Sequence, residues 1–463
     1  MRLLTDDETK TFFRLLSKVR AKSKRNRLRT QYFEAKKKLD KIGFSIPPHM
    51  HDFAAVIGWA NKTVRVPARR IRPDGFTLPR ESELLSDIED IFEDNYLAAV
   101  ERMAIEASLQ YSVSFLFVTP GDASLGEPEV IVAARSALEA TAEVDERTNR
   151  VLRALEIVNK RKMLLYLPGL TLRIESLESK WFVTAEYDGV PNHVPCTPYI
   201  WGRSLDRPFG SSRITRPVMD FTDMAVRTML RQEGNAEFYS SPQRALMGAD
   251  EAHFTDAKGN RISPLDALLG GIWALPDTFD EEEGKLVRPD LKQLAQATMQ
   301  PHTDMLKTIA MMFSGESSIP VGYLGIIQDN PSSADAIRAN EADLVSVVEA
   351  ELPSIGVARL DLARNVLAVK HGEFTPGMAS ELKGLRAHFA DAGTPTRSAQ
   401  ADAGLKFTQA FPWAADSEVA LEYYGMNKTQ ITRLMAARKL QQNGQRLDAL
   451  VAAAKAPATT EPA

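Results

Sequence analysis

The stretch GIIQDNPSSADAIRANE, residues 325–341, does most to decide the fold. Its first half is rich in turn-forming residues, and Ser332 and Asp335 have the spacing of a capping box at a helix start. A helix is therefore predicted from this point to about Leu352. Pro353 and Gly356 are expected to bend or interrupt it before a further helical segment to Val369.

Two helical segments enclose a loop-rich excursion upstream of this stretch. Apolar residues in 211–239 are spaced for one helix face, and a second helical stretch is predicted from Asp290 to Phe313, with Pro301 expected to kink or restart it. Between them, residues 240–289 break into short apolar pieces separated by turn-forming and acidic loops. This layout predicts a small module carried away from a larger body by two helices.

The first 200 residues predict an α+β domain. A helix is expected over 82–111, preceded by a turn at Pro73–Gly75. Tyr111–Val118 begins with strict alternation of polar and apolar residues, which predicts a half-buried strand. Short strands are expected from there to about Thr197, with Tyr187–Gly189 as a hairpin turn.

The last hundred residues predict two or three short helices. Gly425 has the position of a helix C-cap, and Asn427 that of the next N-cap. The Ala/Pro/Thr-rich tail, residues 456–463, is expected to be disordered.

Basic residues are concentrated near the N-terminus. Residues 1–45 hold 14 Lys and Arg against 5 Asp and Glu, a net charge of +9, and the rest of the chain has a net charge of −13. The segment from Arg14 to Lys38 predicts a basic amphipathic helix. Its apolar side is expected to comprise Phe12, Phe13, Leu15, Leu16, Val19, Leu28, Tyr32 and Phe33, and its basic residues include Lys18, Arg20, Lys22, Lys24, Arg25, Arg27 and Arg29.

Three roles remain open for this basic arm: a surface helix docked on the body, a contact with nucleic acid, or a contact with an acidic neighbouring subunit. The acidic remainder of the chain predicts weak binding to nucleic acid, because affinity for phosphate comes mainly from Lys and Arg.

Bulk composition indicates a folded protein without disulfides. The chain has 463 residues, 44% of them hydrophobic and 25% charged, and Cys196 is its only cysteine. No apolar run is long enough to cross a bilayer, and the charged residues 1–7 do not resemble a signal peptide. The sequence therefore predicts a protein made and kept in the cytosol.

No pattern predicts an active site, a metal or a cofactor. His49, His51 and Asp52 complete no ligand set, and Asp280–Glu283 is better explained as a solvated acidic tip than as a site for a hard cation. The sequence lacks a phosphate-binding P-loop and a GxSxG nucleophile motif. Cys196 has only His193 nearby in sequence as a base, so a structural role is favoured. The chain is expected not to be an enzyme.

The order of these motifs resembles the portal proteins of tailed phages, in particular siphophage portals related to those of actinobacterial phages. Phe209–Ile214 and Phe238–Gly248 are similar to the first stem helix and the entry to the clip, and Gly271–Leu275 to the strand that returns from the clip. Ile319–Gly325 and Asn330–Glu341 are similar to the return stem, the tunnel loop and the long helix behind it. Thr394–Ser398 and Leu421–Gly425 are similar to the approach to the crown. Phe389, where relatives tend to carry Trp, and Pro353 depart from the family pattern.

The resemblance implies an α+β portal fold with wing, helical stem, small α/β clip and helical crown, assembled as a ring. It assigns residues 1–210 to the wing, 211–239 to the first stem helix, 240–289 to the clip, 290–318 to the return stem helix, 319–333 to the tunnel loop, 334–396 to a long kinked helix and the wing return, and 397–455 to the crown.

The resemblance also implies a function. A ring, usually of twelve subunits, would form the channel at one capsid vertex for packaging, retention and ejection of double-stranded DNA, after assembly in the host cytoplasm. Expected partners are the terminase, the head-tail adaptor, the major capsid protein and a scaffold. The channel loop would comprise Ile326, Ile327, Gln328, Asp329, Asn330, Pro331, Ser332 and Ser333, and the clip contacts Asp256, Lys258, Asn260 and Trp273.

Two alternatives belong to other classes. A nucleic-acid-processing enzyme or RNA-binding protein would use the basic arm together with scattered carboxylates. Another structural virion protein would share the composition but lack the succession of stem, loop and long helix.

Overall fold

The computed structural model describes residues 1–39, 55–80, 82–178, 180–239, 244–247, 278–280, 284–287, 290–293, 298–326, 334–393 and 397–455. Several expectations lie outside the described residues: the loop 327–333, the tail 456–463, and the clip residues Asp256, Lys258, Asn260 and Trp273.

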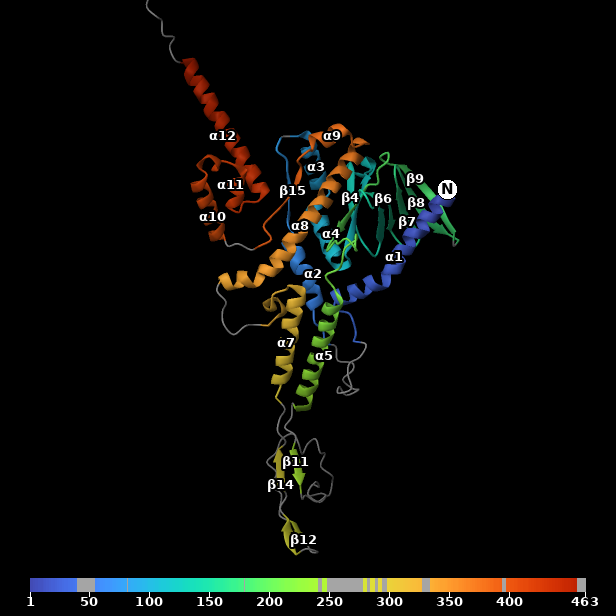
Figure 1. Ribbon diagram of the computed structural model, residues 1–463, viewed down its shortest axis with the longest axis vertical. Helices are drawn as coiled ribbons and strands as arrows, with labels where there is room; N and C mark the ends of the chain where they lie inside the picture. The colour runs from blue at the N-terminus through green and yellow to red at the C-terminus, as the bar shows by residue number, and fades with distance from the viewer. Residues whose placement is uncertain are drawn as a thin grey trace, which may run out of the picture.

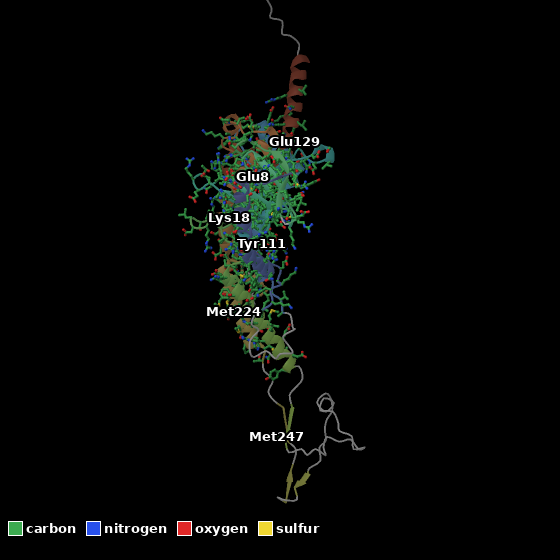
Figure 2. The ribbon with its side chains drawn as sticks, turned by 90° about the vertical axis from the view of Figure 1, so that its right-hand side faces the viewer. Glu8, Lys18, Tyr111, Glu129, Met224 and Met247 are labelled. Carbon is green, nitrogen blue, oxygen red and sulfur yellow. The ribbon has the colours of Figure 1, made fainter. Side chains whose placement is uncertain are left out.

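The molecule consists of a mixed helix and sheet body with two extensions at opposite ends. Figure 1 shows helices α5 (Arg216–Tyr239) and α7 (Gln300–Ser317) leaving the body side by side toward the short strands β11, β12 and β14, and α12 (Lys428–Lys455) pointing away at the other end. In Figure 2, Met224 and Met247 lie successively farther from the body along the first extension.

Helix α1 (Asp6–Phe33) confirms the predicted amphipathic segment, with a shifted range. It starts at a capping box in which Thr5 and Glu8 bond each other's backbone N–H. It ends five residues before Lys38 because Ala35 adopts a left-handed conformation, with φ 54°. Most of the predicted apolar side is buried or half-buried, but Phe13 is 47% exposed, so its assignment to that side was wrong.

A six-stranded antiparallel sheet lies beneath α1, in the order β1-β9-β8-β7-β6-β5. Phe12, Leu15 and Leu16 of α1 pack on one face of this sheet. The strands are β1 (Arg2–Leu3), β5 (Ala140–Val144), β6 (Val151–Ile157), β7 (Lys162–Leu167), β8 (Leu170–Leu177) and β9 (Lys180–Asp188).

A three-stranded sheet, β10-β3-β4, packs against the other face of the large sheet. Its strands are β3 (Val113–Pro120), β4 (Val130–Ser136) and β10 (Cys196–Ile200). The prediction that β3 is half-buried was wrong: Phe115 and Phe117 face the large sheet, and Leu116 and Val118 face the helices. The polar residue that suggested alternation within β3 is Ser114. Its side chain is buried, and its hydroxyl donates to the Ala104 carbonyl at 2.6 Å.

The predicted hairpin turn at Tyr187–Gly189 was wrong. Asp188 ends β9, but the next strand, β10, pairs with β3 in the other sheet. The chain crosses between sheets here, and the turn-forming composition of the segment gave no sign of which strand would follow.

Helices cover the far face of the three-stranded sheet. The helix predicted over 82–111 is two helices, α3 (Glu83–Asp94) and α4 (Leu97–Tyr111), because Tyr96 takes a left-handed conformation between them. Helix α2 (Trp59–Arg70) precedes them, and β2 (Pro73–Thr77) pairs with β15 (Arg386–Phe389). Pro73–Gly75, expected as a turn, therefore belongs to a strand.

The return from the first extension begins as a strand. β14 (Asp290–Gln293) pairs with β11 (Arg244–Met247), and β12 (Thr278–Asp280) pairs with β13 (Lys285–Val287). The helix expected from Asp290 therefore starts only at Gln300, with Pro301 in its first turn, where a missing N–H costs no helical hydrogen bond.

Helix α8 (Ala334–His371) is the longest helix and carries Pro353 inside it. Figure 1 shows α8 bent along its length rather than interrupted, which confirms the first of the two outcomes expected for Pro353. Short 3-10 turns lie at Ala123–Leu125, Val321–Leu324 and Pro412–Ala414.

The C-terminal part is helical. It contains α9 (Pro376–Glu381), α10 (Arg397–Ala410), α11 (Glu418–Tyr423) and α12, whose 28 residues exceed the short helices expected. The predicted caps are confirmed: Gly425 has φ +77° just after α11, and Asn427 Oδ1 accepts from the backbone N–H of Gln430 at 2.8 Å. No helix among the described residues is both long and apolar enough to span a membrane.

Candidate channel site

The two extending helices are joined to the body through apolar contacts. Val218 and Ala225 of α5 and Ile309 and Phe313 of α7 are buried in the same core as α2 and α8. Farther out, Asn235 Nδ2 donates to Met299 Sδ at 3.2 Å between the two elements. The ends of α5 and α7 nearest the body are therefore fixed by packing in the main core.

The chain segment before residue 327 is held by α2. Trp59 Nε1 donates to the Leu324 carbonyl at 3.2 Å, and Lys62 Nζ donates to the carbonyl of Tyr323. Ile326, the one predicted loop residue that the structure describes, packs against the main core. The entry to the loop is therefore anchored by both polar and apolar contacts.

The segment after residue 333 is tied to the same helix through Arg70. The Arg70 guanidinium lies 2.9 Å from Glu341 Oε2 on α8 and donates to the Tyr323 hydroxyl at 3.1 Å. The Tyr323 hydroxyl in turn donates to Glu341 Oε1, and Arg70 also donates to the Ala392 carbonyl at 2.9 Å. One buried arginine thus holds both ends of the segment 327–333.

This network alters the titration of its members. Burial alone would lower the pKa of Arg70, but its bonds to Glu341 and Tyr323 outweigh burial and raise it. Tyr323 and Glu341 lie in motifs named above, but their link to Arg70 was not predicted, because Arg70 and Tyr323 are 253 positions apart in the sequence.

The basic arm divides into two halves. In the first, Arg14 Nε and Lys18 Nζ lie 2.8 Å and 3.0 Å from Glu143 on β5. In the second, Arg29 donates to the Tyr111 carbonyl at 3.2 Å. All seven predicted arm residues, Lys18, Arg20, Lys22, Lys24, Arg25, Arg27 and Arg29, line one groove of about 1870 Å³ together with Arg207 and Arg216.

The groove lowers the pKa of two of its cations, Arg29 and Lys22. Burial, together with the nearby charges of Arg25 and Arg207, lowers the pKa of Arg29 to about 10. Burial and the charges of Arg25, Lys18 and Arg29 also lower the pKa of Lys22. Each shift means that the folded chain disfavours the charged form.

The residues considered for catalysis form no catalytic pair. Cys196 is buried, and burial raises the pKa of its thiol well above the usual value. His193 Nε2 instead lies 2.6 Å from Asn365 Oδ1 of α8. Across the described part of the chain, no group of three potential ligands is arranged to hold a metal ion.

A family model described as phage portal protein, SPP1 Gp6-like, matches residues 15–409. The chain belongs to this family. The match spans most of α1, the extending helices and both anchored ends of the loop. It identifies the chain as a portal protein, a structural component of the phage head-tail connector.

Two portal proteins are among its relatives. That of Mycobacterium phage L5 is 27% identical over 393 residues, covering 81% of this chain and 77% of the relative. That of Mycobacterium phage D29 is 27% identical over 396 residues, covering 82% and 78%.

Solved structures with some likeness include the neck of an empty gene transfer agent particle, with a TM-score of 0.46 and 12% identity over 82% of this chain and 91% of that chain. The neck of a native particle of the same kind has a TM-score of 0.38 and 12% identity over 70% of this chain and 83% of that chain.

Proposed function

We propose that twelve copies of this portal chain close into a ring at one capsid vertex, through which double-stranded DNA is packaged, retained and ejected. The observation that carries the proposal is the helix pair α5 and α7, which extends from the body beside a loop whose two ends are anchored. Copies placed around an axis with these elements inward enclose a channel.

Each contact in such a ring joins two different faces of the chain, so opposite charges on the two faces favour closure. The sequence supplies them, with a basic N-terminal arm and an excess of acid elsewhere. The acidic excess also suits a conduit, because a lumen that bound phosphate tightly would slow the movement of DNA.

The loop Ile326–Ser333 forms the constriction of this channel. Trp59 and Arg70 hold the described residues Leu324 and Glu341 on either side of this loop. Its polar groups contact the DNA backbone weakly and without base recognition, and Asp329 repels phosphate.

The finer assignments follow from this arrangement. Residues 240–289 form the clip, which docks the terminase and later the head-tail adaptor, and residues 397–455 form the crown at the opposite end. Residues 1–210 form the wing, which meets the capsid protein. The chain performs no catalysis of its own in this assembly.

Native mass spectrometry and electron micrographs of the purified chain test the ring. A closed particle of about a dozen subunits with a central opening supports the proposal. A stable monomer with nuclease activity would contradict it and favour the alternative of a nucleic-acid-processing enzyme.

Deletion of Gln328–Asn330 tests the constriction. The deletion leaves the anchors Arg70, Tyr323 and Glu341 in place, so rings are expected to assemble normally while DNA packaging or retention falls. Deletion of Glu146–Thr148, in the exposed turn between β5 and β6, is the matched control. Full-genome packaging by the loop deletion would refute the assignment.

A further inference from the structure

The second half of α1 carries cations without carboxylate partners. Within the described residues, no carboxylate forms an ion pair with Lys22, Arg25, Arg27, Arg207 or Arg216, whereas Lys18, one turn earlier, is paired with Glu143. Asp206 is the one acidic residue among the described side chains that line the groove. The groove is therefore strongly positive.

This charge opposes the folding of an isolated subunit. Lys18, Lys22, Arg25 and Arg29 follow one another at spacings of three and four residues, which place like charges side by side on a helix. Burial is the main cause of the lowered pKa values of Lys22 and Arg29, and the neighbouring like charges lower both pKa values further. An anionic occupant would remove this repulsion.

The floor of the groove favours a polypeptide as that occupant. Half-buried Phe209 and Met219 lie among the lining residues, beside Thr141 of β5. A DNA duplex presents phosphates on its outer surface, and its apolar groups, such as the thymine methyl, lie inside its grooves and do not face a concave protein floor. A protein segment supplies carboxylates and apolar side chains together.

We propose that the groove between α1 and residues 206–219 receives an acidic segment of a neighbouring copy of this chain. The inference rests on the proposed ring, in which every copy presents one face to the next. Outside residues 1–45 the chain has a net charge of −13, so a second copy supplies the needed charge.

The opposite side of the body carries acidic groups. Figure 2 shows Lys18 toward the left of the body and Glu129 toward its right. The pKa of Lys370 is raised mainly by its hydrogen bond to Asp87, and the negative charges of Asp87, Glu129 and Asp90 raise it further. These three carboxylates therefore lie near Lys370. A neighbouring copy that presented such carboxylates to the groove would complement its positive charge.

Charge reversal tests the proposal in the full chain. The double variant Lys22→Glu and Arg25→Glu is expected to weaken each contact between neighbouring subunits about tenfold at low salt, which is about 1.4 kcal/mol per contact, so the fraction of chains in closed rings falls. The control Arg147→Glu and Arg161→Glu makes the same charge change at exposed turns of the large sheet and is expected to stay within about twofold of wild type. Native mass spectrometry at two salt concentrations measures both.

The outcomes separate this proposal from the ring itself. Normal assembly of Lys22→Glu and Arg25→Glu into DNA-packaging rings overturns the groove proposal alone. A wild-type chain that stays monomeric overturns both. Normal assembly with weakened binding to a DNA duplex assigns the groove to DNA and overturns the proposal.

Cross-linking identifies the occupant directly. Cys196 is buried, so Arg25→Cys adds a single accessible thiol for a photo-reactive label. In rings mixed from isotopically labelled and unlabelled copies, the label is expected to capture an Asp- and Glu-rich peptide from another copy. Capture only within one copy, including residues 40–54, would overturn the proposal.

Discussion

Arginines in two regions of this portal chain differ in burial and in pairing: those in the body core are buried beside carboxylates, and, among the described residues, those in the second half of α1 are not. Arg359 on α8 is 3% exposed, lies 2.8 Å from Glu101 and sits 4.7 Å from the ring of Phe76. Arg25 on α1 is exposed and has no carboxylate partner among the described residues. The buried, paired arginine stabilises the fold of one subunit. An exposed arginine without a carboxylate partner is stabilised by charge pairing only when an anionic group from outside the subunit binds beside it.

Replacing the most buried arginine should have the largest effect. Arg359→Met leaves Glu101, which also accepts from Tyr199 at 2.9 Å, as an unpaired charge in the core. The variant is expected to lose about 3–5 kcal/mol of stability in denaturant unfolding. The double variant Arg359→Met and Glu101→Gln should recover part of this loss, and equal losses in both would contradict the pairing argument.

The same pair predicts a dependence on pH. Burial raises the pKa of Glu101 even beside Arg359, so the folded state holds its proton more tightly than the unfolded state. Stability from this group therefore falls as pH rises through the folded pKa. Arg359→Met should steepen this fall in melting temperatures measured from pH 5 to 8, while the double variant with Glu101→Gln should lack it.

The second-largest effect is expected at the loop anchor. Arg70→Met removes the bonds to Glu341 and Tyr323 and should cost about 2–4 kcal/mol. Hydrogen exchange should rise at the end of α7 and the start of α8, on both sides of residues 327–333. Tyr323→Phe keeps the ion pair and should cost about 1 kcal/mol. Faster exchange on one side only would show that the two ends are held separately.

A smaller loss should follow from the paired half of α1. Glu143→Gln weakens the contacts with Arg14 and Lys18 and should cost about 1 kcal/mol at neutral pH. Burial would raise the pKa of Glu143, but Lys18 and Arg14 lower it, so its contribution is present above the unfolded pKa and lost as pH falls. The difference between wild type and variant should therefore shrink in acid, which unfolding at pH 3 and 7 measures.

The smallest effect on subunit stability, a gain instead of a loss, should come from the second half of α1, whose cations have no carboxylate partners among the described residues. Lys22→Gln and Arg25→Gln remove like-charge neighbours and should stabilise an isolated subunit by about 0.5 kcal/mol at low salt. The gain should disappear at high salt, where surface charges are screened. A loss of stability at low salt would mean that these cations already have partners within the subunit.

Local patterns in the sequence predicted local features well. The caps at Gly425 and Asn427, the helix over most of 211–239 and the bend in the helix containing Pro353 depend on neighbours a few residues apart. The break at Tyr96 was missed because a left-handed tyrosine has no propensity signal.

Features that depend on distant residues were not predictable. Strand β3 is buried on both faces only because a second sheet and a helical layer meet there, and the link from Arg70 to Glu341 joins α2 to α8. The seven arm residues line one groove in the structure, but their division into paired and unpaired halves depends on where Glu143 lies.

The bend in α8 divides this long helix into two arms. At 38 residues the helix is roughly 57 Å long, and Pro353 has no N–H to offer the carbonyl of Glu349. In the arm after Pro353, Asn365 donates a hydrogen bond to the Thr197 hydroxyl, and Lys370 donates one to the Asp87 carboxylate. Before Pro353, Glu341 is bonded to Arg70, and Leu344 and Val348 are buried in the main core. Both arms of α8 are therefore fixed to the body, and the bend sets the angle between them.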